Sequence, residues 1–227
     1  MQRYIRNEQM LSREENLRLR DFRVAVAGCG GLGGYIIELL ARLGIGHITA
    51  IDGDVFDISN LNRQLLSHPG NLGLSKAEQA RERIAMINQD VVLTPRHVTI
   101  TKKNAVSILQ NHDIVADALD NISTRRIVAE AANKLKIPMV HGAIAGWHAQ
   151  LATIFPGDHT LDIIYPEGVD KGAESELGNP SFTPAMAASL QVAEILKVLL
   201  KKEGVLRNKL LVIDTLRHDY QIIELNS

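Results

Sequence analysis

A glycine-rich loop, VAVAGCGGLGG at residues 24–34, constrains the fold of this 227-residue chain more than any other stretch. Gly28, Gly30 and Gly33 have the G-x-G-x-x-G spacing, after an apolar run and before a helical pattern. Such a loop leaves backbone N–H groups uncovered at a helix N-terminus, where they bind phosphate groups. The loop therefore predicts a strand–loop–helix unit with a phosphate-bearing ligand, but it does not distinguish a dinucleotide from another nucleotide.

Strand-like and helix-like segments alternate through the first two thirds of the chain. We expect Ser75 to be the N-cap of one of these helices, with Glu78 completing a capping box. The alternation predicts an α/β fold, with a mostly parallel sheet and helices on both faces. The expected strands are 23–28, 47–52, 91–99, 113–119 and 138–146, and the expected helices are 31–44, 75–88 and 124–136.

The last third of the sequence has a different organisation. Residues 147–155 and 210–225 read as strands without crossover helices, so we expect antiparallel additions to the sheet edge. Residues 156–180 between them are rich in Gly, Pro, Asp and Glu, and predict a long lid or docking loop, with a disordered excursion as the alternative. The chain is predicted to be a single domain over residues 1–227, with a nucleotide-binding part at about 21–145 and an antiparallel part at about 146–227.

Composition excludes several classes of protein. The 25 basic and 26 acidic residues nearly cancel, which argues against nucleic-acid binding through a basic surface. Cys29 is the only cysteine, so an internal disulfide and a multi-cysteine zinc site are excluded. The N-terminus is too charged for a signal peptide. The apolar segment 182–200 carries Gln191, Glu194 and Lys197, so it predicts an amphipathic or buried helix and no membrane span; we expect a cytoplasmic protein.

The residues after the glycine loop favour a triphosphate. Asp52 ends the second strand, 24 residues after Gly28, and suits a ribose diol of either NAD or ATP. A polar run then follows, and it leads to Lys76 on the next helix. Arg63, within this run, and Lys76 together supply more positive charge than a diphosphate requires, which favours a triphosphate. The alternative for Arg63 is an ion pair on the surface. The members of the run are Asn60, Asn62, Arg63 and Gln64.

The stretch ADALDN places two carboxylates at the end of the fourth strand, Asp117 and Asp120. Open α/β folds bind their ligands at this carboxyl edge. Mg²⁺ prefers one or two carboxylates together with phosphate oxygens and water. We expect Asp117 to pack or cap locally, and Asp120, followed by Asn121, to be the metal ligand.

Taken in order, GCGGLG, the strand-two Asp, SNLNRQ, the Lys of LSKAEQA and ALDN resemble the ThiF/MoeB/HesA family, the bacterial relatives of ubiquitin-activating enzymes. The likeness covers nearly the whole chain. It implies an adenylyltransferase that binds ATP and Mg²⁺ and adenylates a carboxylate. That carboxylate is usually the C-terminal Gly-Gly of a small ubiquitin-like sulfur carrier (ThiS- or MoaD-like), which docks on the antiparallel part, as in thiamine or molybdopterin biosynthesis.

The resemblance also implies roles for individual residues. Gly31 lies against the phosphates beside Gly28 and Gly30, and Asp52 binds the ribose. Lys76 contacts phosphate, and Asp120 holds Mg²⁺ with Asn121 beside it. Four further residues lie along the nucleotide: Ser59, Asn60, Arg63 and Gln64.

An N-terminal arginine carries a prediction about assembly. Arg6, in RYIRN, matches a family arginine that reaches into the partner subunit's site. The resemblance thus implies a homodimer with composite active sites, in which Arg6, Arg63, Lys76 and Asp120 are catalytic. The alternative for Arg6 is a solvated side chain on a mobile terminus.

The chain departs from the family in its cysteines. Many relatives carry two C-x-x-C pairs for structural zinc and a separate reactive cysteine, and this chain has neither. His141, His148 and His159 are the remaining candidate zinc ligands, but lone strand histidines are more often core or rim residues, so we predict no zinc. Cys29 is interpreted as a small packing residue. The predicted chemistry then stops at the acyl-adenylate or passes it to a nucleophile on another protein.

Three other functions stay open at this point. The acceptor carboxylate could belong to a small molecule or to a tRNA, although the near-neutral charge disfavours tRNA. A nicotinamide-dependent dehydrogenase is supported only by the glycine loop. A non-catalytic scaffold is disfavoured because Arg63, Lys76 and Asp120 are all retained. Neither the acceptor nor its pathway can be read from the sequence.

Overall fold

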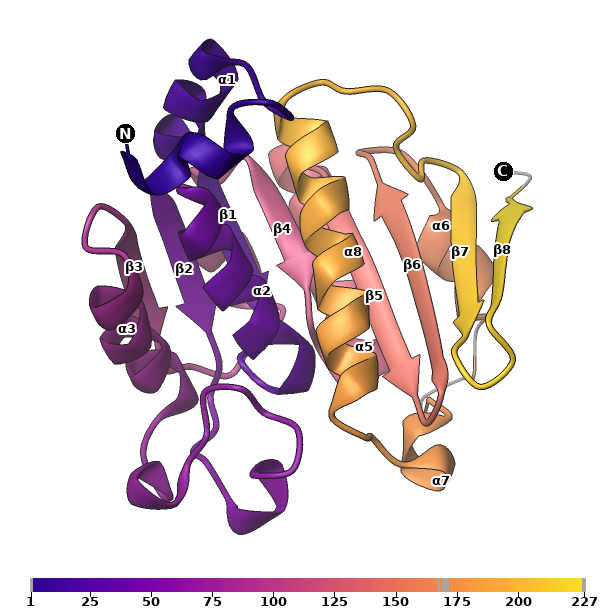
Figure 1. The fold of residues 1–227 in the computed structure, drawn as a ribbon. Helices are drawn as coiled ribbons and strands as arrows, with labels where there is room; N and C mark the ends of the chain where they lie inside the picture. Colours follow the sequence, from indigo (N-terminus) through magenta and orange to yellow (C-terminus); the bar gives the residue numbers. More distant parts are fainter. Residues whose placement is uncertain (1, 167, 169–171, 226–227) are drawn as a thin grey trace.

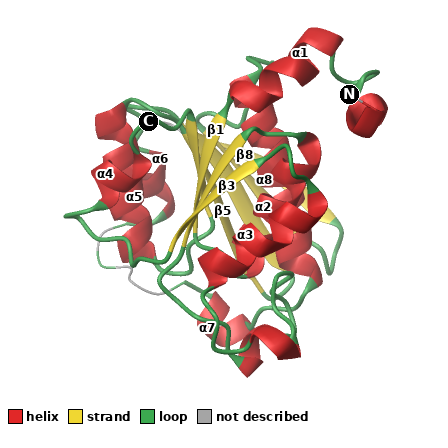
Figure 2. Cartoon of the chain, turned by 90° about the vertical axis from the view of Figure 1, so that its left-hand side faces the viewer, coloured by secondary structure: helices red, strands yellow, loops and turns green. Residues whose placement is uncertain are grey.

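An eight-stranded sheet with helices on both faces forms the protein (Figures 1 and 2). The computed structural model describes residues 2–166, 168 and 172–225. The strand order is β3-β2-β1-β4-β5-β6-β7-β8. The predicted α/β fold, mostly parallel with antiparallel strands in the C-terminal part, is confirmed.

Five parallel strands form the first part of the sheet. β1 lies between β2 and β4, with Val24 opposite Ile48 on one side and Ile114 on the other. Four of its five residues are buried because helices cover both faces. The strands are β1 (Arg23–Ala27), β2 (His47–Ile51), β3 (Val92–Arg96), β4 (Ile114–Asp117) and β5 (Met139–Ala145).

The helices form two layers (Figure 2). One layer contains α2 (Gly31–Leu43), α3 (Lys76–Ile87) and α8 (Phe182–Leu199), and α2 packs against α8. The other contains α4 (Ala105–Leu109), α5 (Ile122–Leu135) and α6 (Thr160–Ile164). By length and composition alone, α8 could cross a membrane. Half of it is buried, however, and it packs against β5 and β6, as expected for a buried core helix.

Three antiparallel strands complete the sheet. β6 (His148–Ile154) pairs with β5 and with β7 (Lys209–Asp214), and β8 (Asp219–Glu224) forms the edge. Residues 210–225, predicted as one strand, are therefore a hairpin; Asp214 pairs with Asp219 across the turn, where His218 adopts φ 54°. All six residues of β8 are exposed.

Several short helices were not expected from the sequence. The N-terminal segment contains the 3₁₀ turns Gln2–Asn7 and Leu19–Asp21 and the helix α1 (Arg13–Arg18), which begins with a capping box between Ser12 and Glu15. Two more 3₁₀ turns, Ile58–Asn60 and Pro69–Asn71, lie between β2 and α3.

Residues 156–180 were predicted to be a continuous loop, but they contain two short helices. These are α6 and α7 (Glu174–Leu177). Residues 167 and 169–171 of the predicted loop lie outside the described part of the chain. Helices of five and four residues are too short to show a helical period in the sequence.

The predicted capping box of α3 is only half present. The Ser75 hydroxyl accepts a hydrogen bond from the Glu78 backbone N–H at 3.4 Å, so Ser75 is the N-cap. The Glu78 carboxylate instead pairs with Arg81, at 2.7 Å, one turn along the helix.

Candidate active site

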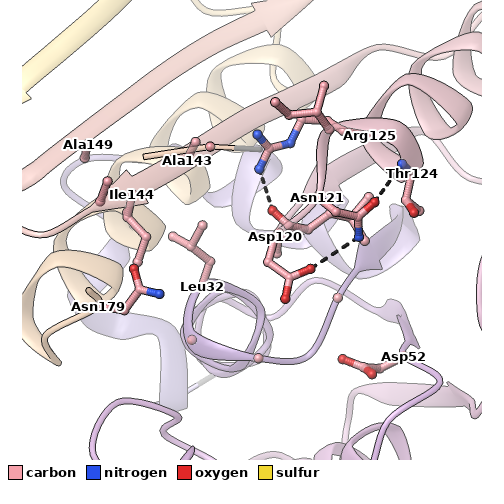
Figure 3. A pocket seen from close by; sticks show the side chains of 18 of the residues that line it. Leu32, Asp52, Asp120, Asn121, Thr124, Arg125, Ala143, Ile144, Ala149 and Asn179 are labelled. Carbon is pink, nitrogen blue, oxygen red and sulfur yellow. Dashed lines mark hydrogen bonds between the residues drawn. The ribbon is translucent and has the colours of Figure 1, made fainter. Parts of the chain in front are cut away.

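A cavity of about 660 Å³ opens at the carboxyl ends of the parallel strands and continues beneath β6. Its first part lies beside the glycine loop and the ends of β2, β3 and β4. Its second part is lined by small apolar side chains, including Ala143, Ala145 and Ala149. In the view of Figure 3, Asp120 lies between Asp52 on one side and Ile144 on the other.

The glycine loop packs too closely for side chains at two positions. A Cβ atom at Gly33 would lie 1.9 Å from the Gly28 carbonyl oxygen, and a Cβ at Gly28 would lie 2.6 Å from the Ala118 carbonyl oxygen. Gly28 also adopts φ 97°, which favours glycine. Gly30, the N-cap of α2, and Gly31 line the cavity, so backbone N–H groups at this helix N-terminus face it.

Asp52 is fixed at the end of β2 by backbone donors. Its Oδ2 accepts a hydrogen bond from the Cys29 N–H at 2.7 Å, and its Oδ1 accepts one from the Asp54 N–H at 2.8 Å. Burial raises the pKa of Asp52, and these N–H groups together with the Lys76 ammonium oppose that effect. Each Asp52 carboxylate oxygen keeps a lone pair that can accept a further hydrogen bond from a ligand hydroxyl group.

Lys76 extends into the cavity from the first residue of α3. Its side chain is 9% exposed, and its ammonium lies 3.2 Å from Asp54 Oδ2. The backbone N–H of Lys76 also donates to the Asp54 carbonyl at 3.1 Å. The Asp54 carboxylate itself is 75% exposed, so Lys76 is a largely buried cation with an exposed counter-ion.

Arg63 lines the cavity with partners that carry no charge. Its Nη1 donates to the Ser59 carbonyl and to Asn62 Oδ1, each at 2.9 Å. The surface ion pair considered as the alternative is not found among the described residues. Gln64 also lines the cavity, and its buried Oε1 has no hydrogen-bond partner within the described chain.

Ser59 and Asn60 lie outside the cavity lining. Asn60 Oδ1 accepts a hydrogen bond from the Asp57 N–H at 3.0 Å and closes the turn that precedes Arg63. Ser59 contributes its carbonyl to Arg63. In this structure both residues shape the loop, and their contact with a nucleotide, which the resemblance implied, stays a prediction.

The two carboxylates of ADALDN lie in different environments. Asp120 lines the cavity, where its Oδ1 accepts from Asn121 Nδ2 at 3.3 Å; Asn121 Oδ1 in turn caps α5 by accepting from the Thr124 N–H at 2.8 Å (Figure 3). Asp117 is fully buried and pairs with Arg125 and His141, as expected for a packing residue. Burial alone would raise the pKa of Asp117, but these two partners hold it below its usual value.

The ThiF family model matches residues 2–227 of this chain. The chain belongs to the ThiF family. Its relatives include the SAMP-activating enzyme E1 of Haloferax volcanii, 32% identical over 91% of this chain and 77% of that protein. Another is a sulfur carrier protein adenylyltransferase of Thermus thermophilus, 35% identical over 90% of this chain and 79% of that protein. The predicted family and enzyme class, an adenylyltransferase, are confirmed.

Longer relatives and solved structures extend this comparison. The chain spans about half (49%) of an adenylyltransferase and sulfurtransferase MOCS3 of Culex quinquefasciatus, at 32% identity over 92% of this chain. Its fold is similar to that of E. coli MccB with ATP, with a TM-score of 0.83 and 21% identity over 99% of this chain and 71% of that one. It also resembles TcdA (CsdL), with a TM-score of 0.75 and 26% identity over 88% and 94% of the two chains.

Arg6 of this ThiF-family chain lies far from its own cavity. It belongs to the 3₁₀ turn Gln2–Asn7, whose Tyr4 ring packs against Gly44 at the end of α2. α2 begins at the cavity and runs for 13 residues, a length of about 20 Å. In Figure 1 the N-terminus accordingly lies at the opposite end of the sheet from α7, which borders the cavity. Arg6 therefore does not reach the cavity of its own chain.

Cys29 and the three candidate zinc-ligand histidines have separate environments. Cys29 is fully buried, and burial raises the pKa of its thiol, so it is a packing residue as predicted. His141 lies in the core, His148 is exposed at the start of β6, and His159 is exposed beside Asp162. Within the described residues, no group of three His, Cys, Asp or Glu side chains is placed to hold a metal ion.

Most side chains that line the second part of the cavity were not predicted individually from the sequence. Arg125, Gln150 and Tyr165 line its wall, and Leu177 and Asn179 line its mouth. Gly146, at the β5–β6 turn, donates its N–H to the Gly178 carbonyl and so brings the next residue, Trp147, near the mouth. Trp147 packs on Phe182 with ring centroids 4.8 Å apart, and both are partly exposed. Arg125 had a local signal because it lies on the helix that follows ALDN. Tyr165, Leu177 and Asn179 lie in the segment 156–180 that was predicted to be a lid or docking loop, but nothing singled them out within it.

Proposed function

We propose that this chain uses ATP to adenylate the C-terminal carboxylate of a small ubiquitin-like sulfur carrier of the ThiS/MoaD type. One observation carries the proposal: a single cavity joins a helix N-terminus, a fixed carboxylate and two cations to an extension lined in part by small apolar side chains. The first part suits the phosphates and ribose of a nucleotide. The extension has small side chains, which suit an extended tail without bulky residues. Relatives named as sulfur carrier adenylyltransferases support this choice of acceptor.

The reaction needs no side-chain nucleophile. A carboxylate oxygen of the carrier attacks the α-phosphorus of ATP, the bond to the bridging oxygen breaks, and pyrophosphate leaves with that electron pair. The chain positions both reactants and stabilises charge that moves toward the pyrophosphate. The α2 N-terminus and the cations Arg63 and Lys76 are the groups that do this, and Asp52 orients the ribose.

The charges of the cavity support a need for a metal ion. Asp52, Asp54 and Asp120 face the nucleotide part, against the two cations Arg63 and Lys76. A triphosphate would add further negative charge to this excess. Asp120 fits a Mg²⁺ ion, because it is a cavity carboxylate with room for phosphate oxygens and water. When bound, Mg²⁺ would neutralise part of the negative charge on the phosphate oxygens.

The placement of Arg6 supports a composite site in a homodimer. Because this arginine lies about the length of α2 from its own cavity, a catalytic role for it would require the cavity of another subunit. The nucleotide part of each cavity also has more carboxylates than cations, and a partner arginine would add positive charge there. Arg6 would then act like an arginine finger supplied in trans.

Nucleotide binding and acceptor choice are tested separately. Mg-ATP at about one hundred times its Kd should raise the melting temperature by about 5–10 °C, and NAD should hardly change it. Pyrophosphate exchange should then require a carrier with a free C-terminal Gly-Gly carboxylate, and the same carrier with an amidated C-terminus should be inactive. A melting shift with NAD alone would overturn the adenylation proposal. Exchange driven only by small-molecule carboxylates would overturn the carrier as acceptor.

A further inference from the structure

A buried polar network lies behind the wall of the cavity, which two of its members, Arg125 and Tyr165, line. Its four members come from four segments: Asp117 ends β4, Arg125 lies on α5, His141 on β5, and Tyr165 follows α6. Asp117 and His141 are fully buried, and Arg125 and Tyr165 are 4% and 8% exposed. Neither the proposed chemistry nor the family resemblance gives Tyr165 or His141 a role.

The Tyr165 hydroxyl is the centre of this network. Arg125 Nη1 and Gln150 Nε2 donate to it at 2.6 and 2.7 Å. His141 Nδ1 lies 2.7 Å from Asp117 Oδ2 and donates its proton there, which leaves Nε2 as an acceptor. The Tyr165 O–H donates to this Nε2 at 3.3 Å. Among these three side chains of the described residues, the hydroxyl accepts hydrogen bonds from two and donates one to the third.

This pattern of donors does not change near neutral pH. Burial and the neighbouring Arg125 guanidinium lower the pKa of His141, so the imidazole stays neutral. Asp117 stays ionised because Arg125 Nε lies 2.9 Å from its Oδ2. A neutral histidine between a carboxylate and a phenol has only one tautomer that satisfies both partners.

Arg125 connects the network to the loop that carries Asp120. Its Nη2 donates to the carbonyl of Leu119, the residue before Asp120, and contacts the Gly142 carbonyl at 3.4 Å. One guanidinium thus holds Tyr165 at one end and the backbone beside Asp120 at the other. Figure 3 shows the guanidinium directed at this backbone, with Asp120 and Asn121 beyond it.

We infer that Tyr165 is a positioning residue that couples residues 160–166, on the acceptor side, to the Asp120 loop on the nucleotide side. The inference rests on the proposed function, because it takes the ligand of the Asp120 loop to be a nucleotide. Removing the hydroxyl would leave the buried Arg125 and His141 and the partly buried Gln150 without this hydrogen-bond partner. The low polarity of the surroundings increases the free-energy cost of such a loss. Binding that fixes one side must then favour order on the other, and the coupling is reciprocal.

The test uses amide hydrogen exchange with the Mg²⁺ complex of α,β-methylene-ATP, so no carrier is required. In the wild-type protein this probe should slow exchange in residues 28–34 and also, by about tenfold, in residues 160–166. In Tyr165→Phe, the probe should still slow exchange in residues 28–34 but should no longer slow it in residues 160–166. Gln150→Met removes only one donor to the Tyr165 hydroxyl, so the protection of residues 160–166 should fall about threefold. This variant replaces Tyr165→Phe in the test if the latter does not fold.

Thr153→Val is the matched control. The Thr153 hydroxyl is also buried in the sheet, and it donates to Glu194 Oε2 at 2.7 Å, outside the network. Its loss also leaves a buried partner unsatisfied, but both exchange effects should persist. This control separates the coupling from a general loss of stability.

Two results would overturn the inference. One is a wild-type protein in which residues 28–34 are protected and 160–166 are unchanged; the other is a Tyr165→Phe protein that keeps the second effect. A wild-type protein without protection at residues 28–34 would instead overturn the proposed nucleotide site, and the inference with it. The two failures are therefore distinguishable.

Discussion

The parallel and antiparallel halves of the sheet differ in what they present to the cavity. At the ends of β2 and β4 stand Asp52 and Asp120, and the strands before them are covered on both faces. Beneath β6 the cavity wall contains Ala143, Ala145 and Ala149, and the sheet ends in β8, whose six residues are all exposed. The charged groups for nucleotide chemistry thus lie in the half of the sheet that helices cover on both faces. The half that would receive the acceptor has small apolar side chains along the cavity and an exposed edge strand.

The largest expected effect tests the parallel half. Lys76→Met should lower pyrophosphate exchange by at least about a hundredfold with any carrier, because a largely buried cation beside the phosphates is lost. Lys134→Met removes an exposed lysine that pairs with Glu130 on α5 and is the control, with unchanged exchange. Activity of Lys76→Met within about threefold of wild type would show that the charged half does not carry the chemistry.

Arg6→Ala tests whether the parallel half is complete within one chain. Turnover should fall by about ten- to a hundredfold while ATP affinity changes less, because the contact matters most as charge develops. Mixing this variant with Asp120→Ala should restore up to about one quarter of wild-type activity, since half of randomly paired dimers are mixed and each has one intact site. No recovery, with subunit exchange demonstrated, would mean that Arg6 does not act in trans.

A smaller effect is expected in the antiparallel half. Trp147→Ala should raise the KM for the carrier about tenfold and leave ATP affinity unchanged, because the exposed Trp147–Phe182 pair lies near the mouth of the apolar extension. Met86→Ala removes a more exposed apolar side chain on α3, at the other end of the sheet, and should change neither value. A shift in ATP affinity with Trp147→Ala would contradict the separation of the two halves.

Cys29→Ala should have the smallest effect. Pyrophosphate exchange should stay within about twofold of wild type, because only the backbone N–H of Cys29 contacts Asp52. The buried thiol, with its raised pKa, should also resist iodoacetamide at pH 8 in the folded wild-type protein and react only after denaturation. Loss of exchange by more than about a hundredfold, the scale for a catalytic group, would give the thiol a chemical role.

Residues close to a strand end or a helix start could be predicted from the sequence. Each of these residues follows a strand or begins a helix at the carboxyl edge of the sheet, so the local sequence pattern is enough to place it at the cavity. They are the glycine loop, Asp52, Lys76 and Asp120. Ser59 and Asn60 belong to the same kind of motif but close a turn, which the resemblance did not reveal.

The polar network behind the cavity could not be predicted in this way. Asp117 and His141 are 24 residues apart, and His141 and Tyr165 are another 24 apart, so no local spacing connects them. His141 looked like a lone strand histidine, and Tyr165 lay within a segment that was expected to be a loop. Only the meeting of β4, β5 and the end of α6 joins these side chains, and that meeting is a property of the tertiary fold.

The ion pair between Lys76 and Asp54 means that an anion binding beside Lys76 must compete with a carboxylate that is already there. Before any ligand arrives, the ammonium already has a carboxylate 3.2 Å away, so an incoming anion must replace a partner of like charge. A singly charged anion such as bicarbonate or chloride exchanges one monoanion for another and gains little. A polyphosphate offers several charges to the helix N-terminus, Arg63 and Lys76 at once, and we expect it to compete with Asp54 far better than a monoanion does. The pocket would then discriminate among ligands by the number of charges that they carry, before base or sugar is recognised.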